Sequence, residues 1–305
     1  MNELQHFKKV GDYHKLANLP APEHPLISLV DYKEVKYPDD VLKLRWQQDY
    51  YTIGLKRNVP HKFFYGQQEY DFDEGLMTFV APKQVMSLGD NPNIRTRKPS
   101  GYLLLVHPDF LWNSSLARQI QNYDFFGYGV RESLFLSQKE EEQMESILKN
   151  IRNEYRSNID KFSQKIIVAQ LELLLNYAER FYERQFITRT ISNHEIVGQL
   201  ESLLNDYFKD DTLIEKGLPS VQWVAAELHR SPNYLSSLLK SETGQSTQQH
   251  IHDKLITKAK EHLSITTLSV SEIAYKLGFE RHTSFTKLFK TKTQMTPLEF
   301  RKAFN

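Results

Sequence analysis

The chain has 305 residues, of which 40% are hydrophobic and 25% charged, a composition typical of a globular protein with two domains. It contains no cysteine, which excludes disulfides, thiolate catalysis and cysteine-ligated zinc. No apolar run approaches the ~20 residues that span a bilayer, and the first ten residues lack the apolar centre of a signal peptide. We therefore expect a cytosolic protein without a membrane partner.

The charge is unevenly distributed along the chain. The net charge of the whole is +1, but residues 216–305 contain 13 lysines and arginines against 7 aspartates and glutamates. The remaining residues hold 26 basic against 31 acidic side chains. A basic C-terminal part favours a polyanionic partner, although a solvated and mildly basic domain would have the same composition.

Short strands are predicted for the N-terminal third of the chain. Residues 51–56 alternate between apolar side chains and polar or small ones, which is the period of a half-buried strand. Further apolar runs follow at 61–65, 76–80 and 102–106, with turn-forming residues between them. Several strands at this spacing, with no helix between them, predict an antiparallel barrel or jelly roll.

Two helices are expected after the strands. Ser137 and Glu140 form the capping box S-x-x-E that begins a helix with one apolar stripe. A second helix over residues 161–182 is apolar enough to bury two of its sides, and the apolar period then lapses. The sequence therefore predicts a first domain over residues 1–184, a linker over 185–193 and an all-helical domain over 194–305.

Two segments of the C-terminal part resemble each other. Val221–Leu228 matches Val270–Leu277 at an offset of 49 residues, and Leu235–Thr243 matches Phe285–Thr293 at an offset of 50. The extra residue falls between the two helices of the second copy, in a loop, where an insertion disturbs the least structure. Each copy is therefore predicted to form two short helices joined by a turn.

Capping residues bound both helix pairs. In the first pair Ser220 and Ser231, the latter followed by a proline, begin the two helices and Gly244 ends the second one. In the second pair Ser269 begins the first helix and Gly278 ends it. This pattern predicts two helix-turn-helix units. A helix of ~25 Å over residues 247–263 would join them and hold their second helices about one DNA turn, ~34 Å, apart.

The second helix of each unit presents an outward face of small, polar or cationic side chains once its apolar residues are turned to the core. Such a face can enter the ~12 Å major groove, bond base edges and contact phosphates. A row of ordinary amphipathic helices with solvated faces is the alternative, which two matched units in tandem disfavour. The outward residues are Asn233, Ser236, Ser237 and Lys240 in the first unit, and Thr283, Ser284, Thr286, Lys287 and Lys290 in the second.

Residues Leu218–Phe304 resemble the AraC/XylS family of bacterial transcription regulators. The resemblance is clearest in SPNYLSSLLKSETG (231–244), SVSEIAYKLGF (269–279) and LFKTKTQMTPLEFRK (288–302). It implies that the second helix of each unit lies in the major groove of DNA. The residues that would then contact DNA are Asn233, Ser236, Ser237 and Lys240, together with His282, Thr283, Ser284, Thr286 and Lys287.

Three positions depart from the family's pattern. Ser237 stands where an arginine is common, which predicts weak base reading by the first unit. Arg281 replaces the usual N-capping Ser or Asp and is expected to contact phosphate instead. Gln294 replaces a common glycine, which predicts modest strain in that turn.

The family commonly places a cupin-like barrel before its DNA-binding part, and YDFDEGLMTFVAPKQ (70–84) resembles a passage of such sensor barrels. Metal-binding cupins cluster His and Glu, whereas His61 and His107 stand alone and Gln84 occupies a frequent histidine position, so we predict no metal and no other cofactor. The helices of 137–182 resemble the family's dimerisation element, or pack on their own barrel. Strand aromatics are more often core than ligand contacts, but six are candidates for an effector pocket, namely Phe63, Tyr65, Tyr70, Phe72, Phe79 and Trp112.

The predicted fold is α+β with two domains: a cupin-like β-barrel (jelly roll) with helices, then an all-α domain in which a linking helix joins two helix-turn-helix motifs. The predicted function is a cytoplasmic, homodimeric, sequence-specific regulator that binds promoter DNA, with a small-molecule effector in the barrel, RNA polymerase as a further partner and no catalytic activity. Two alternatives remain open, a regulator whose barrel only dimerises and a cupin enzyme with a DNA-binding appendix. The sequence leaves open whether transcription is raised or lowered.

Overall fold

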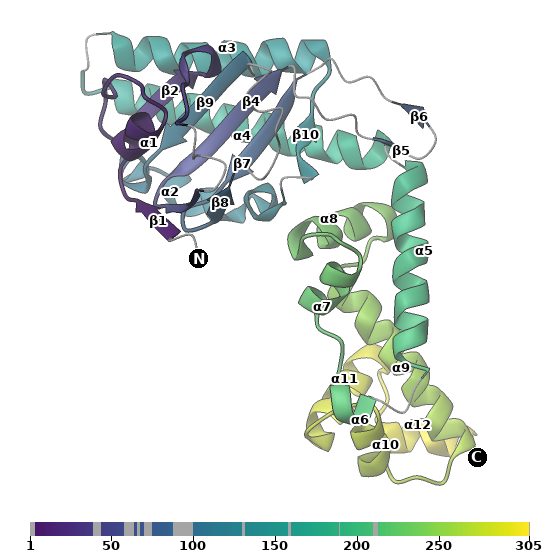
Figure 1. Cartoon of the computed structure of the whole chain (residues 1–305). Helices are drawn as coiled ribbons and strands as arrows, with labels where there is room; N and C mark the ends of the chain where they lie inside the picture. The colour runs from purple at the N-terminus through teal and green to yellow at the C-terminus, as the bar shows by residue number, and fades with distance from the viewer. Residues whose placement is uncertain are drawn as a thin grey trace. The chain divides into compact units, whose positions relative to one another are not determined.

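The computed structural model divides into two compact units, Met1–Thr188 and Arg189–Asn305, according to the contacts along the chain (Figure 1). Among its described residues the first unit contains strands and helices, and the second contains only helices. The structure describes residues 4–38, 44–57, 64–65, 68–69, 75–87, 100–129, 132–157, 160–188, 190–209 and 213–304.

A five-stranded antiparallel sheet with the order β10-β7-β4-β9-β2 forms the centre of the N-terminal unit. In the middle of β4, Ile53 pairs with Phe79 on one side and with Leu104 on the other. The predicted half-buried alternation of β4 is wrong: its first five residues are all buried, because both faces of the sheet are covered. The strands are β2 (Ile27–Asp31), β4 (Tyr51–Arg57), β7 (Leu76–Val80), β9 (Ser100–Val106) and β10 (Leu134–Phe135).

A small sheet and a helix cover one face of the large sheet. β1 (Leu4–Phe7) pairs in parallel with β3 (Arg45–Gln48), which pairs antiparallel with β8 (Val85–Ser87). The helix is α1 (Val10–Leu16). One hydrophobic cluster unites these elements with the large sheet, and its members include Phe7, Val10, Tyr13, Trp46, Tyr50, Leu103 and Leu105.

The predicted cupin-like jelly roll is not confirmed, because the described strands do not close into a barrel. They form sheets of five, three and two strands, the last made of β5 (Phe64–Tyr65) and β6 (Gln68–Glu69). The helix α1 also interrupts the first strands, where the sequence predicted no helix. It begins there because the Asp12 carboxylate accepts hydrogen bonds from the backbone N–H groups of Lys8 and Lys9, at 3.0 and 2.9 Å.

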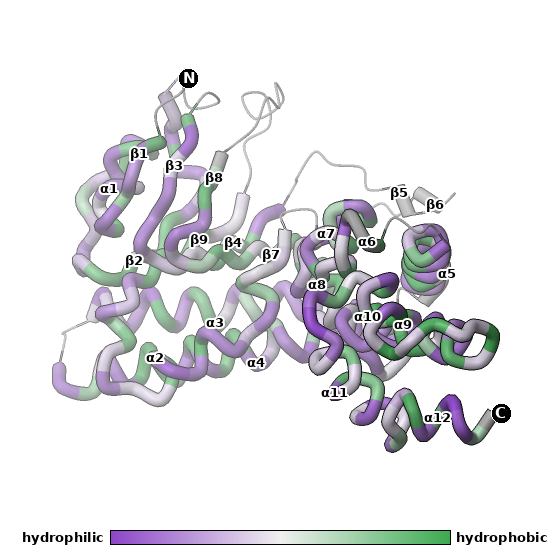
Figure 2. The backbone as a smooth tube through the Cα atoms, turned by 90° about the horizontal axis from the view of Figure 1, so that it is seen from below, coloured by the Kyte–Doolittle hydropathy of each residue, from purple (hydrophilic) through white to green (hydrophobic). Residues whose placement is uncertain are grey.

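Two long helices cover the other face of the large sheet (Figures 1 and 2). They are α3 (Gln138–Arg156) and α4 (Ser163–Thr188), and they pack against each other. The predicted capping box of α3 is confirmed, since the Ser137 N–H donates to Glu140 Oε2 at 2.8 Å. Hydrophilic and hydrophobic residues alternate along both helices in Figure 2, as expected for helices that bury one side.

Short helical turns connect β9 to β10 beneath the same face, and an aromatic cluster holds them there. Phe125 lies between Phe79 of β7 and Tyr182 of α4, with ring centroids 4.6 and 5.5 Å away. Phe126 contacts Phe79 edge-on at 5.9 Å. The turns are η4 (Pro108–Leu111), α2 (Leu116–Gln119), η5 (Ile120–Asn122) and η6 (Asp124–Gly127).

The C-terminal unit consists of helices, as the sequence predicted. Within the described ranges, no helix of the chain combines the length and apolarity needed to cross a bilayer. The helices are α5 (Thr190–Tyr207), α6 (Leu213–Lys216), α7 (Val221–Glu227), α8 (Pro232–Thr243), α9 (Thr247–Ile265), α10 (Val270–Lys276), α11 (His282–Thr293) and α12 (Pro297–Phe304).

Most of the predicted linker over 185–193 is helical. α4 continues to Thr188, beyond the predicted end at residue 182, because its last turns are buried in the N-terminal unit. The Gln185 amide there accepts a hydrogen bond from Phe135 N–H at 2.8 Å and donates to Ser133 C=O at 3.2 Å. The lapse of the apolar period therefore marks the end of one helix and the start of the next.

Candidate nucleic-acid interface

The first helix-turn-helix unit consists of α7 and α8, and serine caps begin both helices. The Ser220 hydroxyl accepts a hydrogen bond from Trp223 N–H at 3.1 Å, and the Ser231 hydroxyl accepts one from Tyr234 N–H at 3.3 Å. Pro232 occupies the first turn of α8. These contacts confirm the local structure that the sequence predicted for this unit.

The second unit consists of α10 and α11, and its two helix starts differ. Ser269 and Glu272 form the predicted capping box, in which Ser269 N–H donates to Glu272 Oε2 at 2.7 Å. Hydrogen bonds from Ser269 lower the pKa of Glu272. The start of α11 has no side-chain cap, because Arg281 occupies the capping position and its side chain accepts nothing.

Apolar side chains seat α8 and α11 on the core of the C-terminal unit. Leu235, Leu238 and Leu239 are fully buried on α8, and Phe285 and Phe289 are fully buried on α11. Leu288 is only half-buried, although the sequence predicted that it faces inward. The equivalent small residues of the first helices, Ala225 and Ala274, are also fully buried.

The helix α9 joins the two units, as predicted. It contacts α5 and α8, which precede it in the chain, and α10, α11 and α12, which follow it. Its buried residues include Ile251, Leu255, Ala259 and Leu263, at the spacing of one helix face. Both helix-turn-helix units therefore pack on one common helix.

The residues predicted to contact DNA fall into two groups. Eight are exposed, and three are half-buried. The exposed group is Asn233 and Lys240 on α8, Arg281 at the start of α11, and His282, Thr283, Ser284, Lys287 and Lys290 on α11.

The half-buried group is Ser236, Ser237 and Thr286, and the hydroxyls of Ser236 and Thr286 form hydrogen bonds within the unit. Ser236 Oγ lies 3.0 Å from Thr247 Oγ1, at the start of α9. Thr286 Oγ1 donates to His282 C=O, one turn earlier in α11, at 3.0 Å. A base contact by either hydroxyl would compete with these bonds.

Asp253, on α9, is a residue that the sequence analysis missed. Its carboxylate accepts hydrogen bonds from Gln245 Nε2 at 2.8 Å and from Lys292 Nζ at 2.7 Å. Gln245 follows the end of α8, and Lys292 lies in the last turn of α11. No sequence pattern indicates this arrangement, because Lys292 is 39 positions away from Asp253.

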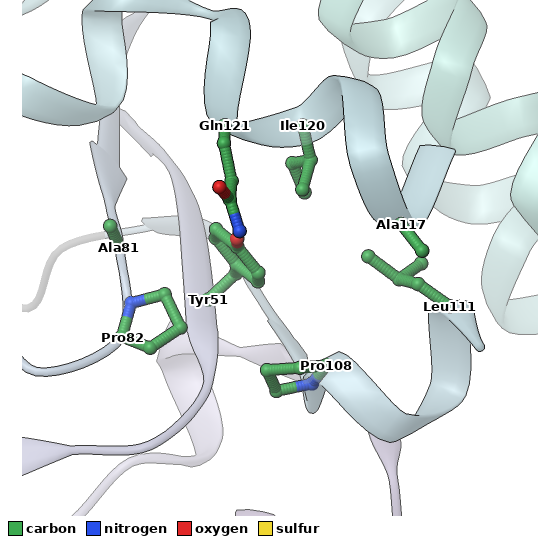
Figure 3. A pocket seen from close by; sticks show the side chains of 8 residues that line it. All are labelled: Tyr51, Ala81, Pro82, Pro108, Leu111, Ala117, Ile120 and Gln121. Atoms are coloured by element: carbon green, nitrogen blue, oxygen red, sulfur yellow. The ribbon is translucent and has the colours of Figure 1, made fainter. Parts of the chain in front are cut away.

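A cavity of about 370 Å³ lies in the N-terminal unit, on the helix-covered side of the large sheet (Figure 3). Tyr51 at the start of β4 forms part of its wall, and burial raises the pKa of this phenol. Gln121 from η5 points toward Tyr51 in Figure 3. The remaining lining residues are small or apolar: Ala81, Pro82, Pro108, Leu111, Ala117 and Ile120.

Neither Phe79 nor Trp112, the two predicted effector contacts whose side chains the structure describes, lines this cavity. Phe79 is buried in the aromatic cluster, and Trp112 is 72% exposed. The structure therefore does not bring these two together in one pocket. Phe63, Tyr70 and Phe72 lie outside the described residues, as does the side chain of Tyr65.

The structure also places two of the residues considered for a metal site. Gln84 has a structural role, since its Oε1 accepts from Ala81 N–H at 3.1 Å and its Nε2 donates to Phe126 C=O at 2.7 Å. His107 Nδ1 lies 3.4 Å from the carboxylate of Asp109. His61 lies outside the described residues, and among the described ones no three His, Asp or Glu side chains form a group that could hold a metal.

Comparison with known proteins identifies the class of the C-terminal unit. Residues 224–303 match the family model of the helix-turn-helix domain. These residues extend from α7 through both units to α12, and they coincide with the duplicated arrangement described above. The prediction of a DNA-binding helix-turn-helix domain is confirmed.

Similar proteins are transcriptional regulators. The chain is 27% identical over 146 residues to the uncharacterized HTH-type transcriptional regulator YfiF of Bacillus subtilis, over 48% of this chain and 43% of the relative. It is 28% identical over 142 residues to the uncharacterized transcriptional regulatory protein YesN of the same organism, over 46% of this chain and 37% of the relative. A solved structure, the C-terminal domain of the response regulator AraT from Geobacillus stearothermophilus, is 28% identical, covering 35% of this chain and 84% of that chain with a TM-score of 0.31.

The chain thus spans about two fifths of the length of these two curated relatives. The family match and the names of the relatives support the AraC/XylS resemblance for the helix-turn-helix part. They leave the cupin-like sensor unconfirmed.

Proposed function

We propose that the chain is a cytoplasmic, sequence-specific regulator that binds double-stranded promoter DNA through both helix-turn-helix units and acts there on RNA polymerase. The observation that supports this most is the duplicated pair α8 and α11, each seated on the core by apolar residues and each exposing polar or cationic ones. The proposal involves no catalytic step and no cofactor.

The exposed residues divide by the kind of contact that they would make. Asn233 on α8 and Thr283, Ser284 and Lys287 on α11 would reach base edges, since short polar side chains and lysine bond the donors and acceptors of the major groove. Arg281, which has no capping role, would contact phosphate. Lys240 and Lys290 stand near the helix C-termini, where phosphate contacts would fix the orientation of each helix.

Selection of DNA sites tests this function. The full chain is used to enrich binding sites from a random duplex pool, and fluorescence anisotropy then measures its affinity for the enriched site at several salt concentrations. We expect a site with two short subsites about one helical turn apart and an affinity that falls steeply with salt. Enrichment of no sequence, or binding that is insensitive to salt, would contradict the proposal.

We further propose that the protein forms a homodimer through the exposed side of α4. Phe162, directly before α4, is 54% exposed, Ile166 is 44% and Leu173 42% exposed, and Ala169 is exposed between the last two. These residues follow one another at intervals of 4, 3 and 4, which is the spacing of a helix–helix seam. The same side of a second copy would cover this apolar stripe.

Sedimentation of charge variants tests the dimer. Ile166→Glu would place a carboxylate in the seam and is expected to convert dimers to monomers. Lys165→Glu, at the neighbouring exposed position of the same helix, changes charge outside the stripe and is the matched control. A dimer that survives Ile166→Glu would exclude this interface.

We also propose that a small-molecule effector binds the cavity of Figure 3. No charged residue is among the described residues that line it, and Tyr51 and Gln121 offer a hydroxyl and an amide. These features fit a neutral molecule with an apolar body and one or two hydrogen-bonding groups. The effector would change DNA affinity only if it bound one arrangement of the protein more tightly than another.

Thermal-shift screening of neutral metabolites tests the effector, with Ala117→Phe as the variant that fills the cavity. We expect a ligand that stabilises the wild-type chain and loses its effect in Ala117→Phe. Arg118→Ala, at an exposed position of α2 outside the cavity wall, serves as a comparison. If no neutral compound distinguishes the wild type from Ala117→Phe, the effector-independent alternative is favoured.

A further inference from the structure

We infer that Asp253 is a positioning residue that fixes the separation of the two recognition helices, and with it the spacing between the two DNA subsites that the chain accepts. This inference depends on the proposed function for its consequence on DNA. It depends only on the C-terminal unit for its structural part. The observation behind it is that one carboxylate contacts the ends of both recognition helices.

The two contacts of Asp253 use different oxygen atoms. Oδ2 accepts from Gln245 Nε2 at 2.8 Å, directly after the αL residue that ends α8. Oδ1 accepts from Lys292 Nζ at 2.7 Å, in the last turn of α11. The side chain of Lys292 is 26% exposed and that of Asp253 42%, so the pair is partly shielded from solvent and contributes modestly.

The location of these contacts allows them to limit small movements of the recognition helices. Each recognition helix is seated on α9 by apolar side chains, which resist separation but permit small rotations about the contact. α8 has two more polar ties to α9, Ser236 to Thr247 at 3.0 Å and Thr243 to His250 at 2.9 Å. The charged Lys292–Asp253 contact ties α11 to α9, and its loss leaves α8 with its two other ties, so we expect α11 to loosen more than α8.

Loss of the tie would change which DNA the protein tolerates. A rigid pair of helices fits two subsites only at one spacing, and an added base pair moves the second subsite by ~3.4 Å and about a tenth of a turn. A loosened pair would accept the altered spacing with a smaller loss of affinity. The affinity for a single DNA site does not test this inference, because removing the negative charge of Asp253 also lessens its repulsion from the DNA phosphates.

The first test is a distance measurement without DNA. The chain has no cysteine, so spin labels at Asn233→Cys and Thr283→Cys report the distance between α8 and α11 without background labelling. Asp253→Asn keeps the shape and the Gln245 contact but removes the charge that holds Lys292. We expect its distance distribution to become broader than that of the otherwise wild-type chain, and an unchanged distribution would overturn the inference.

The second test measures spacing preference on DNA. Anisotropy is recorded on the enriched site and on versions with one base pair added or removed between the subsites. Altered spacing lowers the affinity of the wild-type chain, and we expect Asp253→Asn to reduce this loss by up to about fivefold. A factor of this size corresponds to the free energy that a partly exposed ion pair contributes. The exchanged pair Asp253→Lys with Lys292→Asp is expected to restore part of that penalty.

Glu261→Gln is the matched control, because it removes one negative charge from a pair that lies within α9, with Lys258 at 2.9 Å. It should leave both the distance distribution and the spacing penalty unchanged. A wild-type chain that enriches no DNA site would end the proposed function, while the distance measurement would still decide the role of Asp253. A wild-type spacing penalty that persists in Asp253→Asn would end the inference alone.

Discussion

The two helix-turn-helix units have the same backbone conformation at two equivalent positions. Glycine occupies one of these positions in the first unit and the other position in the second unit. The turn after the first helix adopts a positive φ in both, at His229 (+53°) and at Gly278 (+80°). The end of the second helix does so as well, at Gly244 (+73°) and at Gln294 (+62°). Each unit thus has glycine at one of the two positions and a strained side chain at the other.

This exchange shows that the repeat preserves geometry and not residue type. The capping positions differ in the same way, since Ser231 caps α8 whereas Arg281 leaves α11 uncapped. The recognition helix of the second unit therefore has no side-chain cap at its start and a non-glycine residue at the positive-φ position that ends it. We infer that α11 depends more than α8 on its packing against α9 and on the Lys292–Asp253 pair.

The largest effect is expected from Gly278→Ala, compared with Gly244→Ala. Both add a side chain at a positive φ, but a Cβ at 278 would lie 3.0 Å from backbone atoms of Leu213 and Gly217, whereas at 244 it would meet nothing within 4 Å. We expect a loss of about 2–3 kcal/mol for the first and about 1 kcal/mol for the second.

Urea unfolding monitored through Trp223 measures this pair of variants. Trp223 contacts the ring of Tyr207 in the C-terminal unit, with ring centroids 4.6 Å apart, and replacing Trp46 and Trp112 by Phe removes the signal of the other unit. Equal losses at 278 and 244 would show that the close approach of residues 213–217 does not constrain the second unit.

Two exposed lysines of α11 are expected to have different roles in DNA recognition. Lys287→Ala is expected to weaken binding by ~1–3 kcal/mol and to relax preference at one base step, as for a lost base contact. Lys290→Ala should weaken all sequences alike and reduce the salt dependence by about one phosphate contact. Lys209→Ala, outside both recognition helices, is the control. A change of base preference in Lys290→Ala would contradict these roles.

Arg281→Ser tests the missing cap of α11. Serine at this position can accept a hydrogen bond from the backbone of the first turn, which should stabilise the C-terminal unit by about 1 kcal/mol. The same substitution should lower DNA affinity, because the proposed phosphate contact is removed. Ser231→Ala is the counterpart in the first unit and should lose about 1 kcal/mol of stability. A rise in both stability and affinity would exclude a phosphate contact by Arg281.

Local sequence signals predicted the C-terminal unit well, because its helices are bounded by residues with defined capping roles. Ser220, Ser231 and Ser269 start helices as expected, and Gly244 ends one. The Asp253–Lys292 contact was beyond such signals, since it depends on how α9 and α11 pack and not on residues close in sequence.

The N-terminal unit was predicted less completely. The apolar run at 76–80 coincides with β7, and that at 102–106 lies within β9. The strand β1 has four residues and α1 has seven, too few for a period to stand out. Pairing between sheets depends on contacts between distant segments, and so the choice between a closed barrel and separate sheets was not encoded in any local pattern.

The smallest effect is expected from relieving the two strained turns. Gln294→Gly and His229→Gly should each stabilise the C-terminal unit, but by less than about 1 kcal/mol, because the relief at a positive φ is partly offset by the greater freedom of glycine in the unfolded chain. The same Trp223 unfolding measurement detects the gain. If the two units are constrained alike, the gains should be equal. A larger gain at 294 would indicate that α11, with no cap at its start, is the less stable of the two recognition helices.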